Sequence, residues 1–286
     1  MSRAWTYLQE RFPPLPSALL TAVYVGGGAA VVRALGVEVA WWRAALAGAV
    51  VFLFLLQLRL GDESKDYHKD LELHPERPVQ RGLVTLAEVR RAEMAVAIAQ
   101  AILAAVLGLT AIGAWAALAL YGFFMRREFF AGRLLEPRPI AYALTHQPVM
   151  LLLTGFIQVA VGAAPGDLTA RVPLLHQALS LGLMFAYEVS RKLRAPADED
   201  ARNPTYSQVH GPRVAGMMAA GLLAAAVVAL AGLLGRGYLS ALGLALPALF
   251  YAARPTAGAA KIARVSAEGA LLLLHAALAA RLWSAW

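Results

Sequence analysis

Long apolar runs, rich in alanine and leucine, recur along the whole chain, and they show none of the apolar–polar alternation that predicts strands. A helix that crosses a bilayer needs about 20 mostly apolar residues, and nine runs approach that length. The pattern predicts an all-α polytopic membrane protein with nine transmembrane helices in one domain over residues 1–286. The predicted spans are 14–35, 39–60, 92–110, 111–125, 139–163, 172–190, 212–234, 237–253 and 265–285, with a tight turn at Gly113 between the third and fourth.

Residues 1–16, ahead of the first span, do not have the form of a cleavable signal peptide. Arg3, Glu10, Arg11 and three prolines interrupt them before any apolar core begins. We therefore expect a short helix here on the cytoplasmic side, followed directly by the first span.

The overall composition supports the membrane prediction. Hydrophobic residues make up 59% of the chain and charged residues 15%, whereas soluble domains average about 45–50% and about 25%. Intrinsic disorder is excluded because it requires low hydrophobicity. The absence of cysteine excludes disulfide scaffolds, thiolate nucleophiles, iron–sulfur clusters and cysteine zinc sites.

The formal net charge of +8 is distributed unevenly along the chain. Most of the 26 lysine and arginine residues fall between alternate spans, on the side that also holds the N-terminus. Cytoplasmic loops carry such an excess, so we expect an integral protein of a prokaryotic inner membrane, with a cytoplasmic N-terminus and an external C-terminus. The distribution also argues against nucleic acid as a partner, because no soluble domain is predicted to present a basic surface.

Eight of the 18 acidic residues are concentrated between positions 62 and 93, just after the second span. Asp62, Asp66 and Asp70 are four residues apart, so on a helix their carboxylates share one face at about 5–6 Å intervals. Like charges at that distance favour a bound cation, and Mg²⁺ accepts one or two carboxylates together with substrate phosphates. The alternative is a solvated charged loop, in which Lys65 and Lys69 offset the acids.

A stiff basic segment follows the acids. Two prolines restrict the backbone between His74 and Gly82, and Arg77 and Arg81 lie within it. Their guanidinium groups are expected either to fold back onto the acids or to bind phosphate directly.

These residues together resemble a known motif. The run Asp62-Glu63-x-x-Asp66-x-x-x-Asp70, followed by Arg77-Pro78 and Gly82, is similar to the first aspartate-rich motif of the UbiA superfamily of intramembrane prenyltransferases. The usual form is Asn-Asp-x-x-Asp-x-x-x-Asp. Asp62 stands at the Asn position and Glu63 at the first Asp position, and both can bind metal.

The resemblance implies a bundle of nine helices around a central cavity, with the acidic motifs on the cytoplasmic side. It implies that Asp62, Glu63, Asp66 and Asp70 bind Mg²⁺. It also implies transfer of a prenyl group from a prenyl diphosphate to a lipophilic acceptor, which is apolar or aromatic, within membrane lipid. Asp62, Asp66 and Asp70 would be catalytic, and Arg77 and Arg81 would bind the substrate.

The second acidic motif of the superfamily is altered in this chain. At the corresponding position Glu188 stands for one carboxylate, but Lys192 replaces the Asp expected four residues later, next to Arg191. We expect Glu188 and Arg191 to bind substrate and Lys192 to be catalytic, by contacting diphosphate oxygens where relatives hold a second metal. The alternative for these cations is a purely topological role at a helix end, and a phosphorylated or carboxylated headgroup is equally compatible.

A further basic pair, Arg126 and Arg127, ends the fourth span, where the family often holds phosphate. The positive-inside rule explains the same pair without any substrate. Two other functions stay open for the chain as a whole. One is a related terpene cyclase, which ionises the diphosphate without an acceptor. The other is a non-catalytic lipid-binding or transport protein with the same fold.

Overall fold

The computed structural model describes residues 2–200 and 204–284, and within these ranges the chain forms helices and connecting loops without a strand. The first half, up to the sixth long segment, contains α1 Arg3–Arg11, α2 Pro14–Arg33, α3 Trp41–Lys65, α4 Tyr67–Leu73, α5 Leu86–Leu107, α6 Leu109–Arg126, η1 Glu128–Phe130, α7 Gly132–Leu135, α8 Pro139–His146 and α9 Val149–Ala160. The second half contains η2 Pro165–Thr169, α10 Arg171–Arg191, η3 Pro196–Asp198, α11 Tyr206–His210, α12 Pro212–Leu234, η4 Arg236–Ala245, α13 Leu246–Ala253 and α14 Ala257–Ser284.

Six helical segments in the described ranges are long and apolar enough to cross a membrane. They are α2, α3, α6, the α8–α9 pair over Pro139–Ala160, α12 and α14. The three other predicted spans correspond to α5, α10 and the η4–α13 pair. Charges at Arg90, Arg91 and Glu93 lie inside α5, and the η4–α13 pair is divided between two short helices. The all-helical membrane fold is thus confirmed, while the count of nine spans stays a prediction.

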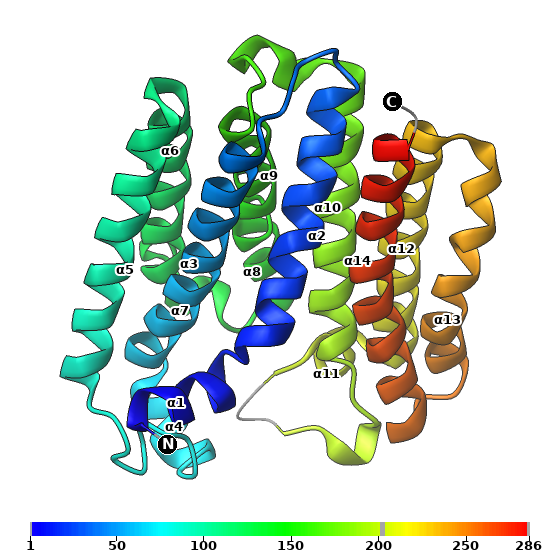
Figure 1. Ribbon diagram of the computed structural model, residues 1–286. Helices are drawn as coiled ribbons and strands as arrows, with labels where there is room; N and C mark the ends of the chain where they lie inside the picture. Colours follow the sequence, from blue (N-terminus) through cyan, green and yellow to red (C-terminus); the bar gives the residue numbers. More distant parts are fainter. Residues whose placement is uncertain (1, 201–203, 285–286) are drawn as a thin grey trace.

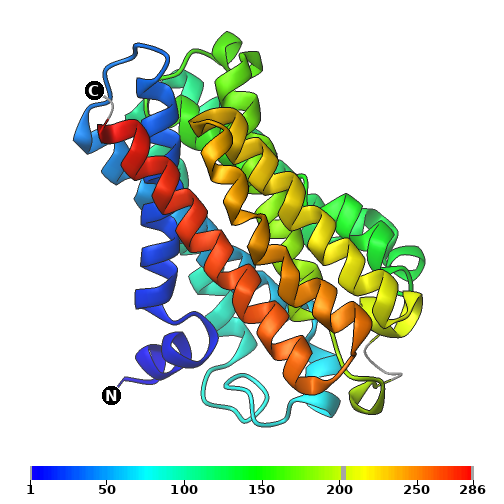
Figure 2. The same cartoon turned by 90° about the vertical axis from the view of Figure 1, so that its right-hand side faces the viewer.

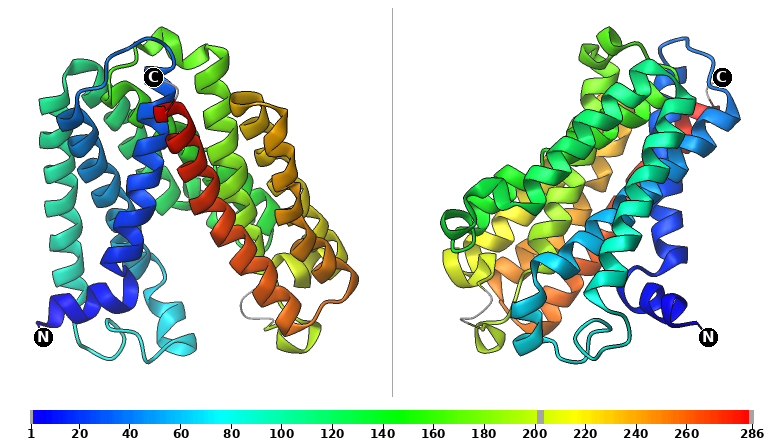
Figure 3. Two further views of the ribbon diagram at one scale, coloured as in Figure 1. Left: turned by 45° about the vertical axis from the view of Figure 1, so that its right-hand side comes forward. Right: turned by 90° about the vertical axis from the view of Figure 1, so that its left-hand side faces the viewer.

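The helices run side by side as one elongated bundle. The short helices α1, α4 and α11 gather at one end, which we call the motif end, whereas the last turn of α14 lies at the opposite end (Figure 1). Figure 2 shows α14 packed obliquely beside α12 and α13. On the other flank α5 lies along α3 (Figure 3). Because α1 and the end of α14 lie at opposite ends, the chain traverses the bundle an odd number of times.

Small residues allow the helices to pack closely. A Cβ atom added at Gly28 of α2 would lie 2.4 Å from Ile157 of α9, and one at Gly182 of α10 would lie 3.1 Å from Ala226 of α12. Glycine and alanine at such crossings are typical of membrane bundles, where van der Waals packing drives helix association.

The turn between the third and fourth predicted spans is at Gly108 and not at Gly113, so that prediction was wrong. Gly108 has φ 111°, a conformation that glycine adopts without a steric penalty, and it ends α5 and begins α6. Gly113 lies inside α6. The guanidinium of Arg43 donates hydrogen bonds to the carbonyl oxygens of Leu107 at 3.1 Å and Ala160 at 2.9 Å. These are the last residues of α5 and α9, whose carbonyl groups have no partner within their own helices.

An apolar groove of about 620 Å³ lies between α2, α3 and α14. Its walls consist mainly of alanine and glycine, with Phe52 and Trp283 as the large side chains. The groove is bordered by three neighbouring helices on one flank of the bundle. The central cavity expected from the resemblance stays a prediction.

Candidate functional site

The first acidic motif lies at the motif end, where α3 passes into α4. Asp66 is the junction residue, with φ −93° and ψ 7°, so the helix is interrupted there. The i to i+4 backbone bonds continue on both sides, from Asp66 N to Asp62 O and from Asp70 N to Asp66 O, each 2.8 Å long. The spacing predicted for the three aspartates is therefore kept through the junction.

Two of the four acids predicted to bind metal are buried against cationic partners within the protein. The Glu63 carboxylate is fully buried, where it accepts a hydrogen bond from Arg11 Nε at 2.6 Å and one from the Tyr7 hydroxyl at 3.4 Å. The Asp70 carboxylate is 5% exposed and pairs with Arg77. Both carboxylates are thus neutralised without a metal.

The other two acids are more open. Asp62 has one ion pair, with Arg59 at 3.6 Å, and its side chain is 49% exposed. The Asp66 carboxylate forms no hydrogen bond or ion pair with any residue that the structure describes. Burial raises the pKa of Asp66, and the charge of Lys65 opposes this rise. No group of three acidic or histidine side chains in the described ranges is arranged to hold a metal by itself. Asp62 and Asp66 lie close enough for their charges to interact.

The two arginines of the stiff segment point to different partners. Arg77 folds back onto Asp70, which is one of its two predicted arrangements. Arg81 instead forms a bidentate pair with Glu10 of α1, with both N–O distances at 2.8 Å, and it also donates to the Glu76 carbonyl. Arg81 therefore links α1 to the stiff segment between His74 and Gly82.

The basic pair at the end of α6 is also divided. Arg126 pairs with Glu93 of α5. Its side chain also passes over Gly61 of α3, where a Cβ atom added to the glycine would lie 3.3 Å from Arg126 Cδ. Arg127 lies over the ring of Phe123, 5.4 Å from its centroid. Arg126 is thereby held next to the first acidic motif.

A left-handed turn after α6 brings in an acid that the sequence analysis missed. Glu128, Phe129 and Phe130 all have positive φ, between 49° and 57°, which costs about 1–2 kcal/mol for each residue that is not glycine. The turn directs Glu128 toward Lys65, at 2.9 Å. Gly132 makes the room for this, because a Cβ there would lie 2.1 Å from Glu128 Oε2.

Tyr142 of α8 connects the two motifs. Lys65 Nζ from the first motif donates to the Tyr142 hydroxyl at 2.7 Å, and Lys192 Nζ from the second lies 5.7 Å from the centre of its ring. His146 stacks on the ring with the centroids 3.8 Å apart. Two cations from distant parts of the chain thus converge on one phenol.

The second motif is a cluster with more cations than acids. Glu188 accepts from Arg191, with Nε at 2.6 Å, and from Lys192 Nζ at 2.8 Å. Lys192 Nζ also lies 5.7 Å from the ring centre of Tyr206, a fully buried residue of α11. The Glu188 carboxylate is therefore shared by two cations, and one positive charge in this group is left uncompensated.

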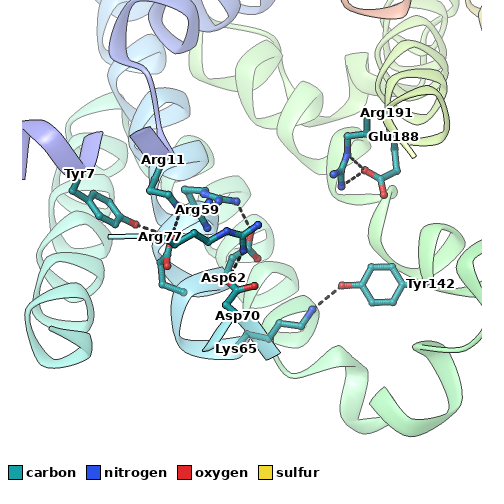
Figure 4. Close-up of polar contacts among 11 residues, drawn as sticks. Tyr7, Arg11, Arg59, Asp62, Lys65, Asp70, Arg77, Tyr142, Glu188 and Arg191 are labelled. Atoms are coloured by element: carbon teal, nitrogen blue, oxygen red, sulfur yellow. Dashed lines mark hydrogen bonds and ion pairs between the residues drawn. The ribbon is translucent and has the colours of Figure 1, made fainter. Parts of the chain in front are cut away.

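Figure 4 shows part of both motifs in one view, with Tyr142. Asp62, Asp70 and Arg77 come from the α3–α4 side, and Glu188 and Arg191 come from α10 on the other side. Arg191 lies within electrostatic range of Asp62. The structure therefore brings most of the predicted residues to one region, with Arg81 fastened to α1 at its edge.

The sequence contains little that could have identified Glu128 and Tyr142. Glu128 carries no motif spacing, and its position depends on three residues in a left-handed conformation. Tyr142 is one aromatic residue in an apolar run, and its importance comes from the two lysines that tertiary packing brings to it.

Comparison with known proteins identifies the fold. No protein-family model matches the chain, and no curated protein matches it. A solved structure of a UbiA homolog from Aeropyrum pernix K1 superposes with a TM-score of 0.70 at 19% identity, over 91% of this chain and 96% of that one. A structure of digeranylgeranylglyceryl phosphate synthase superposes with a TM-score of 0.63 at 15% identity, over 98% and 99%. The predicted resemblance to the UbiA superfamily is confirmed in the fold.

Proposed function

We propose that the protein transfers a prenyl group from a prenyl diphosphate to a lipophilic acceptor within the membrane, with Mg²⁺ as cofactor. The observation that carries the proposal is that Asp62 of α3 lies within electrostatic range of Arg191 of α10, while Lys65 and Lys192 converge on Tyr142 between them. A diphosphate needs both kinds of group, because metal-binding carboxylates and direct cationic contacts each neutralise part of its charge. The UbiA fold supports the same conclusion.

The residues that would hold Mg²⁺ are Asp62 and Asp66. Their carboxylates come from successive helical turns, and neither is neutralised as fully as Glu63 and Asp70. Mg²⁺ usually binds one or two carboxylates and completes its coordination with water and substrate phosphate. When bound, the ion neutralises the diphosphate and makes it a better leaving group. Asp70 would join this set if Arg77 turned toward phosphate.

The cations of α10 would hold the far side of the diphosphate. Arg191 and Lys192 share a single carboxylate, Glu188. A bound diphosphate, which carries more negative charge than this carboxylate, would give each cation a stronger partner. A guanidinium fork matches phosphate oxygens, and an ammonium group adds a compact charge. Arg126, held beside Gly61, is the next cation within the region.

The transfer breaks the bond between the allylic carbon and the diphosphate oxygen, and the electron pair leaves with the diphosphate. The acceptor's nucleophilic atom then bonds to the allylic carbon and loses a proton to solvent. Cations that are already in place when the charge develops on the leaving oxygen lower the barrier most. The apolar groove between α2, α3 and α14 is of a size to take part of an apolar chain.

We also propose that the motif end faces the cytoplasm, in a prokaryotic inner membrane. The basic residues follow this arrangement: Arg33, Arg43, Arg171, Arg236 and Arg281 belong to the opposite end of the helices, and most others belong to the motif end. The N-terminus would then be cytoplasmic and the C-terminus external.

The test uses the purified protein in lipid nanodiscs. Geranyl, farnesyl and geranylgeranyl diphosphate are each supplied with Mg²⁺ and with phenolic, quinone-precursor and glycerol-phosphate acceptors. Mass spectrometry should detect a prenylated acceptor and diphosphate, and both should be lost when the metal is chelated. Glu38→Gln, which removes an exposed acid at the opposite end of the bundle, is the matched control for Asp66→Asn.

The other outcomes separate the remaining functions. A cyclised product from the diphosphate alone would identify a terpene cyclase. If calorimetry finds no binding of Mg²⁺ with a prenyl diphosphate, the protein is a lipid-binding or transport protein and the proposal is overturned.

A further inference from the structure

A second polar pocket lies at the motif end, on the side of α10 that faces α14. It has a volume of about 240 Å³ and is formed by the last residues of α10, the η3 segment and the first turns of α14. Four cationic side chains contribute to its lining and one carboxylate does. They are Arg191, Arg194, Lys261 and Arg264, with Asp198 as the acid.

Two of these cations are available for a ligand. Lys261 is exposed and makes no hydrogen bond or ion pair in the described part of the chain. Arg264 pairs only loosely with Glu268, at 3.7 Å, with both side chains about half exposed. Exposed pairs of this kind contribute little to stability, so an incoming anion displaces Glu268 easily.

The backbone at this pocket also favours an anion. Ala257 and Ala260, in the first turn of the 28-residue helix α14, both line it. The first N–H groups of a helix have no partner within the helix, and the helix dipole adds a partial positive charge. Thr256 accepts hydrogen bonds from the backbone amides of Ala259 and Ala260. The amides of Ala257 and Gly258, which come before them, are left for a ligand.

An unpartnered buried hydroxyl gives an independent indication of a ligand. Ser190 is among the lining residues, is 1% exposed, and its Oγ has no hydrogen-bond partner. A buried polar group without a partner destabilises the folded protein. An oxygen acceptor that came within reach of the Ser190 hydroxyl would remove that penalty.

We propose that this pocket binds a phosphate monoester, carried either by a lipid headgroup or by a soluble molecule. The volume suits a phosphate group with a small substituent, and the cations, helix amides and hydroxyl supply donors on several sides. The pocket lies at the end of the bundle, where a lipid headgroup would reach it from the side. Its occupant is distinct from the diphosphate, which would lie between Asp62 and Lys192, and Arg191 is the lining residue that the two sites share.

The test measures ligand-induced thermal stabilisation of the full chain in detergent. Inorganic phosphate and short-chain phosphatidic acid are titrated separately, with short-chain phosphatidylcholine as the lipid that lacks a monoester. We expect saturable stabilisation by at least one of the first two. Stabilisation by phosphatidic acid alone identifies a lipid headgroup, and stabilisation by both identifies the phosphate group itself.

A pair of charge-matched variants assigns the effect to the pocket. The double variant Lys261→Gln/Arg264→Gln should weaken phosphate binding by about tenfold or more, because two charge-assisted contacts are lost. The control Arg171→Gln/Arg236→Gln removes the same charge at the opposite end of the bundle and should leave the affinity unchanged. No saturable stabilisation, or equal loss in both variants, would overturn the proposal. Neither result depends on prenyl transfer, so the two proposals fail separately.

Discussion

The two motifs at the motif end differ in how their charges are balanced. On the α3–α4 side, four acids face mainly arginines, and two of them, Asp62 and Asp66, are left with little or no compensation. On the α10 side, one acid, Glu188, is shared by two cations. The first side is therefore suited to a metal ion and the second is suited to an anion.

This difference suggests how an altered second motif can still serve a diphosphate. A second metal would need a second set of carboxylates, and Lys192 takes the place where one is expected. The same neutralisation is available if Lys192 and Arg191 contact the phosphate oxygens directly. One metal and two side-chain cations then replace two metals.

The largest effect is expected on the acidic side. Asp66→Ala removes one of the two carboxylates with room for Mg²⁺, and kcat/KM for prenyl transfer should fall by at least about a hundredfold. The variant should fold, because the Asp66 side chain makes no hydrogen bond or ion pair in the described ranges. Circular dichroism checks the fold, and retained activity would contradict the assignment of the metal site.

A smaller loss is expected on the basic side. Lys192→Met keeps the length of the side chain and removes its charge, so kcat/KM should fall by about 10- to 100-fold through weaker stabilisation of the diphosphate. Lys192→Asp is the informative partner, because it restores the usual carboxylate. Its rate should then rise with the square of Mg²⁺ concentration at low Mg²⁺, whereas the native enzyme shows a first-order rise.

The left-handed turn predicts a paired result. Glu128→Gln weakens the contact to Lys65, a charge-assisted pair of about 1.5–3 kcal/mol, and should reduce kcat/KM roughly tenfold. Gly132→Ala should reproduce this loss, because the added Cβ would collide with Glu128 Oε2. Gly221→Ala, where a Cβ meets nothing within 4 Å, is the control. A fully active Gly132→Ala variant would show that activity does not depend on the placement of Glu128 beside Lys65.

The pH dependence should reflect Asp66. Because burial raises its pKa, the carboxyl takes up a proton at a higher pH than an ordinary aspartate, for which the pKa is about 3.9. Only the charged form binds Mg²⁺, so as the pH falls the apparent Mg²⁺ affinity should begin to weaken at a higher pH than it would at an ordinary aspartate. Mg²⁺ titrations of the rate at each pH check this, and an affinity that stays constant down to the pKa of an ordinary aspartate would contradict it.

The smallest effect is expected at Arg81. This side chain is exposed and is held by Glu10 at the edge of the region, so Arg81→Gln should change neither kcat/KM nor Tm measurably. Glu10→Gln is the matched variant that breaks the same pair. A large loss of activity in Arg81→Gln alone would place Arg81 on the substrate.

The sequence predicted the helical membrane fold because apolar runs of bilayer length have few alternative structures. It also predicted the acidic side, where Asp62, Asp66 and Asp70 are close in the chain and one helical turn apart. The Gly113 turn was wrong because both Gly108 and Gly113 permit a turn by composition, and only packing selects between them.

The rest of the region depends on contacts between distant segments. Tyr142 meets Lys65 and Lys192 only after α3, α8 and α10 have packed together. The division of the four acids into two with strong partners and two without depends on Arg11 and Arg77, whose directions no spacing rule provides.

The most direct test of the central claim counts metal ions. Mn²⁺ replaces Mg²⁺, farnesyl thiodiphosphate serves as a slowly reacting substrate, and electron paramagnetic resonance measures the bound Mn²⁺ per chain in nanodiscs. One Mn²⁺ per chain is predicted for the native protein, and none for Asp66→Ala. Two Mn²⁺ per chain in the native protein would contradict the account, because a second metal would then neutralise the diphosphate charge that we assign to Lys192 and Arg191.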